Sequence, residues 1–200
     1  MKNQIIVVLG KKGSGKTYLT RRLITDQRRL VIYDPLRQFS FSGVIFTAPA
    51  PLIEYLKARG PRGFQVVYQP DFSAGDNTDI IQREFQKICR IVDCLSDVYF
   101  VIDEIDLYTS HSSCPAYFNN FIQRGRHQRV SLVVTTRRHT ETTRHLTAQA
   151  DILISFHQHE PNDIKYLGGF FGALAHDLPR LPQYHYIKYD NGVVTREKPI

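Results

Sequence analysis

The stretch that most constrains the fold is residues 10–17, which read Gly-Lys-Lys-Gly-Ser-Gly-Lys-Thr. It directly follows five apolar residues, Ile5 to Leu9, and precedes a segment with helical spacing of apolar side chains. A strand, a glycine-rich turn ending in Lys-Thr, and a helix are the context of a phosphate-binding P-loop. Glycines let successive backbone N–H groups turn around a phosphate, and the helix N-terminus adds partial positive charge. The sequence therefore predicts that the chain binds a nucleoside triphosphate.

The predicted nucleotide ligands come from this motif and the position after it. We expect Lys16 to reach the β- and γ-phosphates and the Thr17 hydroxyl to be a ligand of Mg²⁺. The alternative interpretation, a flexible basic surface loop, does not account for the strand before the turn and the helix after it. The complete set of predicted nucleotide-binding residues is Gly10, Lys11, Lys12, Gly13, Ser14, Gly15, Lys16, Thr17 and Tyr18.

A second motif ends the apolar run at 98–102, where the chain continues as Asp103-Glu104. In open α/β sheets, ligands bind at the carboxyl ends of the strands, so both carboxylates are expected at the same edge as the P-loop. Asp103 suits the binding of hydrated Mg²⁺, and Glu104 suits orienting and deprotonating an attacking water. Asp106, one turn further, is interpreted as a surface acid or as an acid that supports the site from behind. The two motifs together predict hydrolysis of the triphosphate.

A third candidate segment follows the apolar run at 130–134. We expect this strand to lie between the two motif-bearing strands, with a polar sensor at its tip. The tip reads Thr135-Thr136-Arg137-Arg138, so a hydroxyl or a guanidinium could report the γ-phosphate to the rest of the chain. The alternative is a polar loop with solvated arginines.

The predicted fold is a single α/β domain over residues 1–200. Strands are expected at 5–9, 30–33, 44–46, 64–68, 98–102, 130–134 and 152–156, and helices at 17–26, 51–59, 78–95, 115–125, 140–149 and 161–167. Strands that alternate with helices imply a mostly parallel sheet with helices on both faces. The core is expected to span 3–160. An extension over 179–200 is predicted to contain a β-hairpin, since two strand-like runs flank Asp190-Asn191-Gly192.

Charge and composition restrict the class of partner. The formal net charge is +7, and between Leu107 and Ala150 the only acid is Glu141, against six arginines. Such a stretch is typical of contact with a polyanion such as nucleic acid, although a solvated basic face or arginines that bind nucleotide phosphates would also produce it. These arginines are Arg124, Arg126, Arg129, Arg137, Arg138 and Arg144.

Other compositional features exclude several classes. No apolar run approaches the ~20 residues of a membrane-spanning helix, and the run after the N-terminus is too short for a signal-peptide core. The three cysteines, Cys89, Cys94 and Cys114, are odd in number and lack metal-ligand spacing. We interpret them as reduced thiols in a cytosol-like compartment.

The succession of motifs resembles the HerA/FtsK superfamily of DNA-pumping ATPases, whose fold is of the RecA/ASCE type. The resemblance covers about residues 3–160 and rests on the P-loop, Asp34-Pro35, Asp103-Glu104 and Arg124-Gly125-Arg126-His127, with Ala148-Gln149-Ala150-Asp151 before a later strand. Where members carry Ser-Gln-Arg-Pro after the sensor strand, this chain reads Thr136-Arg137-Arg138-His139, so Arg137 replaces the sensor glutamine.

The resemblance implies ATP and Mg²⁺ as ligands and a ring of subunits, a hexamer or a pentamer. In such rings an arginine from the neighbouring subunit completes each site, and Arg124 and Arg126 are the candidates here, with Arg129 in reserve. The P-loop strand begins at residue 5, so we expect the additional N-terminal domain of cellular members to be absent. In this brevity the chain is similar to the small genome-packaging ATPases of membrane-containing icosahedral viruses.

The predicted function is therefore an ATP-hydrolysing motor that moves double-stranded DNA into a capsid. Its expected partners are duplex DNA, contacted through phosphates and without sequence preference, other copies of itself, and capsid or portal-vertex proteins. The expected location is the cytoplasm of the host cell, or the virion. Three alternatives are a filamentous-phage assembly or export ATPase, a nucleotide-gated DNA-binding module with little turnover, and a nucleoside or nucleotide kinase.

Overall fold

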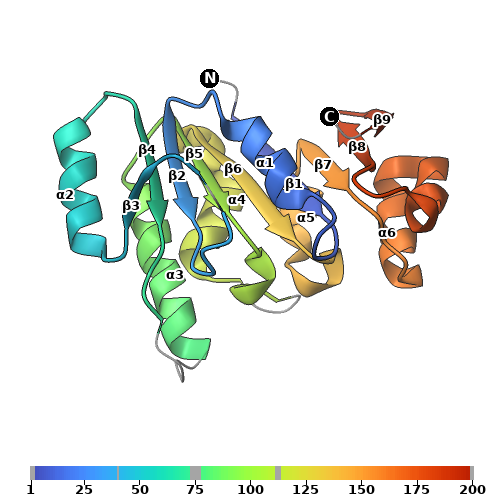
Figure 1. The fold of residues 1–200 in the computed structure, drawn as a ribbon, viewed down its shortest axis with the longest axis horizontal. Helices are drawn as coiled ribbons and strands as arrows, with labels where there is room; N and C mark the ends of the chain where they lie inside the picture. The colour runs from blue at the N-terminus through green and yellow to red at the C-terminus, as the bar shows by residue number, and fades with distance from the viewer. Residues whose placement is uncertain (1–2, 40, 73–77, 111–113, 199–200) are drawn as a thin grey trace.

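The computed structural model describes residues 3–39, 41–72, 78–110 and 114–198. Within these residues the strands form one nine-stranded sheet in the order β3-β4-β2-β5-β6-β1-β7-β8-β9 (Figure 1). All neighbouring pairs from β3 to β7 are parallel, and β8 and β9 are antiparallel additions at one edge. The strands are β1 Ile5–Leu9, β2 Arg29–Tyr33, β3 Val44–Phe46, β4 Phe64–Tyr68, β5 Val98–Ile102, β6 Val130–Thr136, β7 Ile152–Ser155, β8 Tyr186–Asp190 and β9 Val193–Glu197.

The helices connect the parallel strands. The α-helices are α1 Lys16–Ile24, α2 Pro49–Arg59, α3 Thr78–Asp93, α4 Ala116–Gln128, α5 Arg144–Ala148 and α6 Pro161–Phe171. Three short 3-10 helices are η1 Ile105–Leu107, η2 His139–Glu141 and η3 Gly172–Arg180. The predicted α/β class, mostly parallel sheet and terminal hairpin are confirmed. None of the helices in the described part of the chain is long and apolar enough to cross a membrane.

Several predicted boundaries were wrong. The helix predicted at 140–149 is divided into η2 and α5, because Thr142 and Thr143 take extended backbone conformations. Helix α6 continues to Phe171 rather than ending at 167. Gly172 then takes a positive φ of 56° as the first residue of η3, a helix that the sequence did not suggest. Helix α2 begins at Pro49, where proline suits a first turn.

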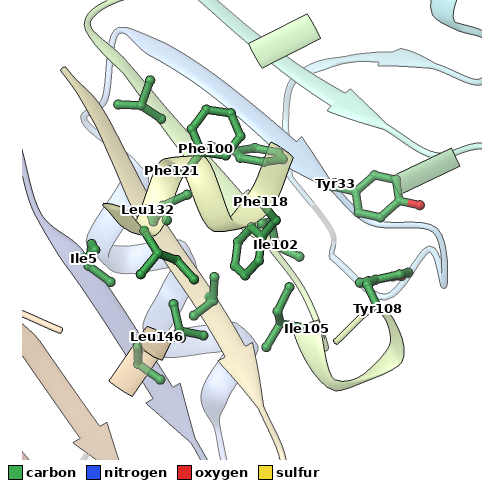
Figure 2. Packing of buried hydrophobic residues seen from close by; sticks show 14 of the residues in the cluster. Ile5, Tyr33, Phe100, Ile102, Ile105, Tyr108, Phe118, Phe121, Leu132 and Leu146 are labelled. Atoms are coloured by element: carbon green, nitrogen blue, oxygen red, sulfur yellow. The ribbon is translucent and has the colours of Figure 1, made fainter. Parts of the chain in front are cut away.

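The two faces of the sheet carry unequal cover. One face packs against α2, α3, α4, α5, α6 and η3 in the larger apolar cluster, whereas the other face is covered in the smaller cluster by α1 and Phe39. Figure 2 shows Phe121 of α4 beside Phe100 of β5, with Leu132 of β6 near them. The rings of Phe100 and Phe121 meet edge-on with centroids 5.8 Å apart. Helices therefore lie on both faces, as predicted, but most of the core lies on one of them.

The order of the central strands positions the site. Strand β6 pairs with β1 on one side and with β5 on the other. The predicted sensor strand thus lies between the two motif-bearing strands, as expected. Since all three strands are parallel, their carboxyl ends meet at one edge of the sheet, where the P-loop and Asp103-Glu104 begin.

Replacement of Phe121 by alanine tests the packing of the larger cluster. Phe121 is 1% exposed, so Phe121→Ala leaves a cavity that should lower the free energy of unfolding by about 3–5 kcal/mol. Urea titration followed by circular dichroism measures this change. Val193→Ala, at a 62% exposed position of β9, is the control and should change it by about 0.5 kcal/mol or less. Equal midpoints for Phe121→Ala and wild type would contradict the packing described.

Candidate active site

The loop between β1 and α1 has the conformation that a phosphate cradle needs. Gly13 and Gly15 have φ values of 77° and 107°, in the region that side-chain-bearing residues rarely adopt. A Cβ atom on Gly10 would lie 2.5 Å from Ser14 Oγ, so only glycine fits there. The Gly10 N–H donates to the Thr136 carbonyl at 3.1 Å, which joins the start of the loop to the end of β6.

Lys16 is buried in this loop and is only 7% exposed. Its Nζ donates to the carbonyls of Gly10 at 2.7 Å and Lys11 at 3.3 Å. Burial lowers the pKa of Lys16, while the nearby carboxylates of Asp103, Glu104 and Asp106 act in the opposite direction. The lysine thus lies within electrostatic reach of all three acids that follow β5.

Thr135 holds the acidic turn after β5 in place. Its hydroxyl donates to Asp103 Oδ1 at 2.6 Å and accepts the backbone N–H of Glu104 at 2.9 Å. Glu104 has a positive φ of 51°, a conformation that costs energy and persists where the surroundings enforce it. Burial raises the pKa of Asp103, which is 5% exposed, and the Thr135 hydrogen bond opposes that rise. One hydroxyl of β6 therefore holds the carboxylate of Asp103 and the backbone of Glu104.

Arg137 lies at the same edge of the sheet, paired with Asp106. Its Nε and Nη2 approach Asp106 Oδ2 at 2.7 and 2.6 Å, and its charge acts on the pKa of Lys16. The Asp106 side chain is only 1% exposed. The interpretation of Asp106 as a surface acid was therefore wrong, because the η1 turn and the Arg137 guanidinium cover it.

Among the described side chains, Arg124 and Arg129 do not join this site within one subunit. Helix α4 ends at Gln128, next to the start of β6, which is the opposite edge of the sheet from the P-loop. Arg124 is exposed in this helix, and Arg129 pairs with Asp97 at 2.7 Å just before β5. Arg126 belongs to the same helix, and its side chain lies outside the described residues. Within one subunit, Arg124 and Arg129 therefore lie toward the edge of the sheet opposite the P-loop.

The predicted basic stretch is partly neutralised by folding. Arg129, Arg137 and Arg138 all pair with acids that lie elsewhere in the sequence. Arg124 and Arg144 are exposed. The excess of positive charge counted along the chain therefore overstates the basic surface available to a polyanion.

Asp163 at the start of α6 was not singled out by sequence analysis. Its buried carboxylate accepts Arg138 Nε at 2.7 Å and lies 2.7 Å from His139 Nδ1. His139 stacks on Tyr166 with ring centroids 4.0 Å apart. Burial alone would raise the pKa of Asp163, but hydrogen bonds from His139 and Arg138 outweigh it and lower the pKa. The cluster ties the segment after the sensor strand to α6.

Asp34, the residue after β2, also has a larger role than the sequence indicated. It is fully buried and accepts the backbone N–H groups of Gln38 and Phe39 and the Gln69 side-chain amide. Its charge is among the causes that raise the pKa of Asp103. The sequence signals were its position at the carboxyl end of a strand and its place in the Asp34-Pro35 pair that contributes to the family resemblance.

Comparison with known proteins identifies the fold. No profile of a known protein family matches the chain, and no curated protein sequence matches it. Among solved structures, the genome packaging NTPase B204 from Sulfolobus turreted icosahedral virus 2, in complex with sulfate, aligns with 22% identity and a TM-score of 0.76, over 100% of this chain and 98% of that chain. The chain has the P-loop ATPase fold of B204.

Two further structures show the same likeness. B204 in complex with AMPPCP aligns with 24% identity and a TM-score of 0.75, over 99% of this chain and 98% of that chain. VirB4 of Thermoanaerobacter pseudethanolicus aligns with 11% identity and a TM-score of 0.74, over 100% of this chain and 90% of that chain. The fold expected from the HerA/FtsK resemblance is therefore confirmed, and the likeness to B204 includes the C-terminal extension.

Removal of the Asp163 carboxylate tests the cluster after the sensor strand. Asp163→Ala loses the charge-assisted hydrogen bond from Arg138 and the close contact with His139, and should lower the free energy of unfolding by about 2 kcal/mol at pH 7. Because the pKa of Asp163 is lowered when folded, its contribution is complete above the ordinary value of 3.8 and is lost as the pH falls through the folded value. Urea unfolding at pH 7 and at stepwise lower pH measures the difference.

The control for this prediction is Asp71→Ala, which removes the exposed partner of Arg37. A pair exposed to this extent contributes about 0.5 kcal/mol or less. If Asp163→Ala were as stable as Asp71→Ala at pH 7, the cluster would not hold α6 to the sensor segment.

Proposed function

We propose that the protein is an ATP-hydrolysing motor that moves double-stranded DNA, and that its task is to package a viral genome. The observation that carries this proposal is the convergence of Lys16, Thr135 and the Asp103-Glu104 turn on one P-loop. The fold likeness to a genome packaging NTPase, over nearly the whole of both chains, supports the packaging task. A packaging motor acts where capsids are filled, so the proposed location is the host cytoplasm or the virion.

The loop suits the triphosphate of ATP. Ser14 Oγ is buried and has no hydrogen-bond partner among the described residues, although it lies inside the glycine turn. The Lys16 ammonium is held by loop carbonyls and is positioned to exchange them for phosphate oxygens. Thr17 and Asp103 would hold Mg²⁺, since both offer the hard oxygen ligands that this ion prefers. When bound, the ion would supply positive charge that offsets the negative charge of the phosphates.

The proposed roles of Asp103 and Glu104 follow from the hydrogen bonds that Thr135 makes to them. We propose that Glu104 orients the attacking water and accepts its proton, because its backbone is held by Thr135 while its carboxylate is partly exposed beside Lys16. The same hydroxyl donates to the carboxylate of Asp103. Movement of β6 would therefore act on the Asp103 carboxylate and on the Glu104 backbone, which makes Thr135, beside Arg137, a candidate for the sensor residue.

Arg137 is the residue that we propose contacts the γ-phosphate of a nucleotide bound in the same subunit. Asp106 holds it near Lys16, so a bound γ-phosphate would compete with Asp106 for the same positive charge. Arg124 and Arg126 remain the proposed contribution of a neighbouring subunit, which implies a ring, either a pentamer or a hexamer. DNA phosphates are the proposed partners of the remaining exposed basic side chains, and capsid or portal-vertex proteins are the proposed docking partners of the ring.

DNA-stimulated hydrolysis of ATP tests the proposed function. Duplex DNA of unrelated sequences should raise the rate of phosphate release equally. This stimulation should fall steeply between about 50 and 200 mM salt, because the affinity of a protein for DNA phosphates decreases with salt concentration. Glu104→Gln should bind ATP with Mg²⁺ near normally and hydrolyse it roughly 10²-fold or more slowly. Malachite-green assays of phosphate and isothermal titration calorimetry measure the two properties.

Three outcomes would contradict different parts of this proposal. Normal turnover by Glu104→Gln would remove Glu104 as the base. Phosphate transfer to a nucleoside in place of water would favour the kinase alternative. ATP binding without turnover, in the presence of DNA, would favour a nucleotide-gated binding module.

Mixing of subunits separates the two arginine roles. Arg124→Ala and Arg137→Ala should each bind ATP but lose about 10²-fold or more in turnover, the loss expected for a donor to developing charge. When Arg124→Ala is mixed with Glu104→Gln, interfaces form in which a normal Glu104 faces a normal Arg124, so activity should partly return.

The matched control is the mixture of Arg137→Ala with Glu104→Gln. If Arg137 acts within its own subunit, no site in that mixture carries both normal residues, and activity should stay low. Recovery in the Arg137 mixture, or failure in the Arg124 mixture, would reverse or remove these assignments.

A further inference from the structure

A cavity of about 330 Å³ lies beside the last glycine of the P-loop. It is bounded by one side of α1, the residue after β7, and the segment that leads into β8. Four of its seven lining residues are aromatic. The lining residues are Gly15, Tyr18, Leu19, Arg22, Phe156, Tyr184 and Tyr186.

The strand order shows on which side of the P-loop this cavity lies relative to Thr135, Asp103 and Glu104. Strand β1 has β6 on one side and β7 on the other. Thr135 and the Asp103-Glu104 turn lie on the β6 and β5 side, so the γ-phosphate must face that side. The rest of a nucleotide held by the same loop must then extend toward β7. The aromatic cavity lies there, because Phe156 follows β7 and its N–H donates to Leu9 of β1 at 2.9 Å.

Tyr184 is placed over the P-loop at a conformational cost. Its φ is 66°, in the left-handed region that an aromatic residue rarely adopts. Its ring carbon Cδ1 lies 3.2 Å from the position that a Cβ on Gly15 would occupy, so the ring packs directly on the loop. The ring is nevertheless 48% exposed, as Tyr18 is 56% exposed on α1. Strain of this kind, together with exposed aromatic surface, is typical of a ligand contact.

The floor of the cavity is rigid by comparison. Phe156 and Tyr186 are 2% and 8% exposed, and their ring centroids lie 5.3 Å apart. A flat group that enters the cavity beside Tyr18 and Tyr184 would therefore meet an apolar surface that is already formed by Phe156 and Tyr186. The volume falls within the range of small-molecule pockets, which starts near ~300 Å³.

We propose that this cavity holds the nucleobase of the bound nucleotide, stacked against Tyr184 and Tyr18. The proposal rests on the proposed function and adds the base to a site so far defined by phosphates alone. Among the described lining residues there is no carboxylate or amide side chain, and Arg22 and the tyrosine hydroxyls are the polar groups. Recognition is therefore by the face of the base. Purines, with the larger face, bind more tightly than pyrimidines, and adenine is barely distinguished from guanine.

A second cavity, of about 390 Å³, shares Phe156 and Tyr184 with the first, but the rest of its lining differs in chemistry. It adds the basic side chains Lys11 and Lys12 and the imidazoles His157 and His185. Positive side chains suit phosphates better than the face of a base. This contrast assigns the base to the aromatic cavity.

Calorimetric titration of four ligands onto the full chain tests the proposal. The ligands are MgATP, MgGTP, MgUTP and magnesium tripolyphosphate, which lacks both sugar and base. Tyr184→Gly removes the ring and relieves the positive φ, so it keeps the fold; Tyr184→Phe keeps the ring and is the matched control. Tyr184→Gly and Tyr18→Ala should bind MgATP about tenfold or more weakly, as expected for loss of one stack, with tripolyphosphate unchanged. Tyr184→Phe should match the wild type.

The outcomes separate this proposal from the proposed function. Equal affinity of wild type and both tyrosine variants for MgATP would overturn the base site, as would equal affinity of wild type for MgUTP and MgATP. Parallel weakening of tripolyphosphate in Tyr184→Gly would also overturn it, because the ring would then act by shaping the P-loop. Tight, tyrosine-dependent binding of MgATP without hydrolysis would support the base site while rejecting the motor.

Discussion

The position of β6 between β1 and β5 is the constraint on which the site depends. Parallel pairing on both sides brings three carboxyl ends to one edge of the sheet, and the Thr135 hydroxyl then connects them. The Thr135 O–H donates to Asp103, and its oxygen accepts the backbone N–H of Glu104. The acidic turn is therefore held by β6, the strand that also accepts the Gly10 N–H. The P-loop, the acidic turn and the sensor strand therefore form one hydrogen-bonded unit. A shift in any of them alters the distance between the lysine and the acids.

Charge balance explains why so many ionisable groups can share this edge. Asp103 and Lys16 are both buried. Burial raises the pKa of Asp103 and lowers the pKa of Lys16, so it favours the neutral form of each group. The attraction between their opposite charges opposes that effect. The Asp106–Arg137 ion pair adds a second pair of opposite charges at this edge. A nucleotide that brings several negative charges would change this balance, and Arg137 is the cation best placed to respond, because Asp106 rather than the loop holds it.

The C-terminal part of the chain belongs to the site more closely than a peripheral extension would. Asp163 of α6 holds Arg138 and His139, the two residues after Arg137. Tyr184 packs on Gly15 from the segment before the hairpin. Helix α6 thus meets the segment after β6, and the segment before the hairpin meets the P-loop. The part of the chain after β7 therefore contacts the site at two separate places.

The P-loop, the acidic turn, the strands and the terminal hairpin could all be predicted from the sequence. Each depends on a local signal: glycines where the backbone needs a positive φ, apolar runs of strand length, and an Asn-Gly turn. The tertiary structure alone decided that Asp106 is buried under Arg137, that Asp163 pairs with Arg138, and that Tyr184 lies over Gly15. The physical reason is that these contacts join segments far apart in the sequence. No periodicity within either segment records its partner, so their side chains acquire these roles only when the sheet brings them together.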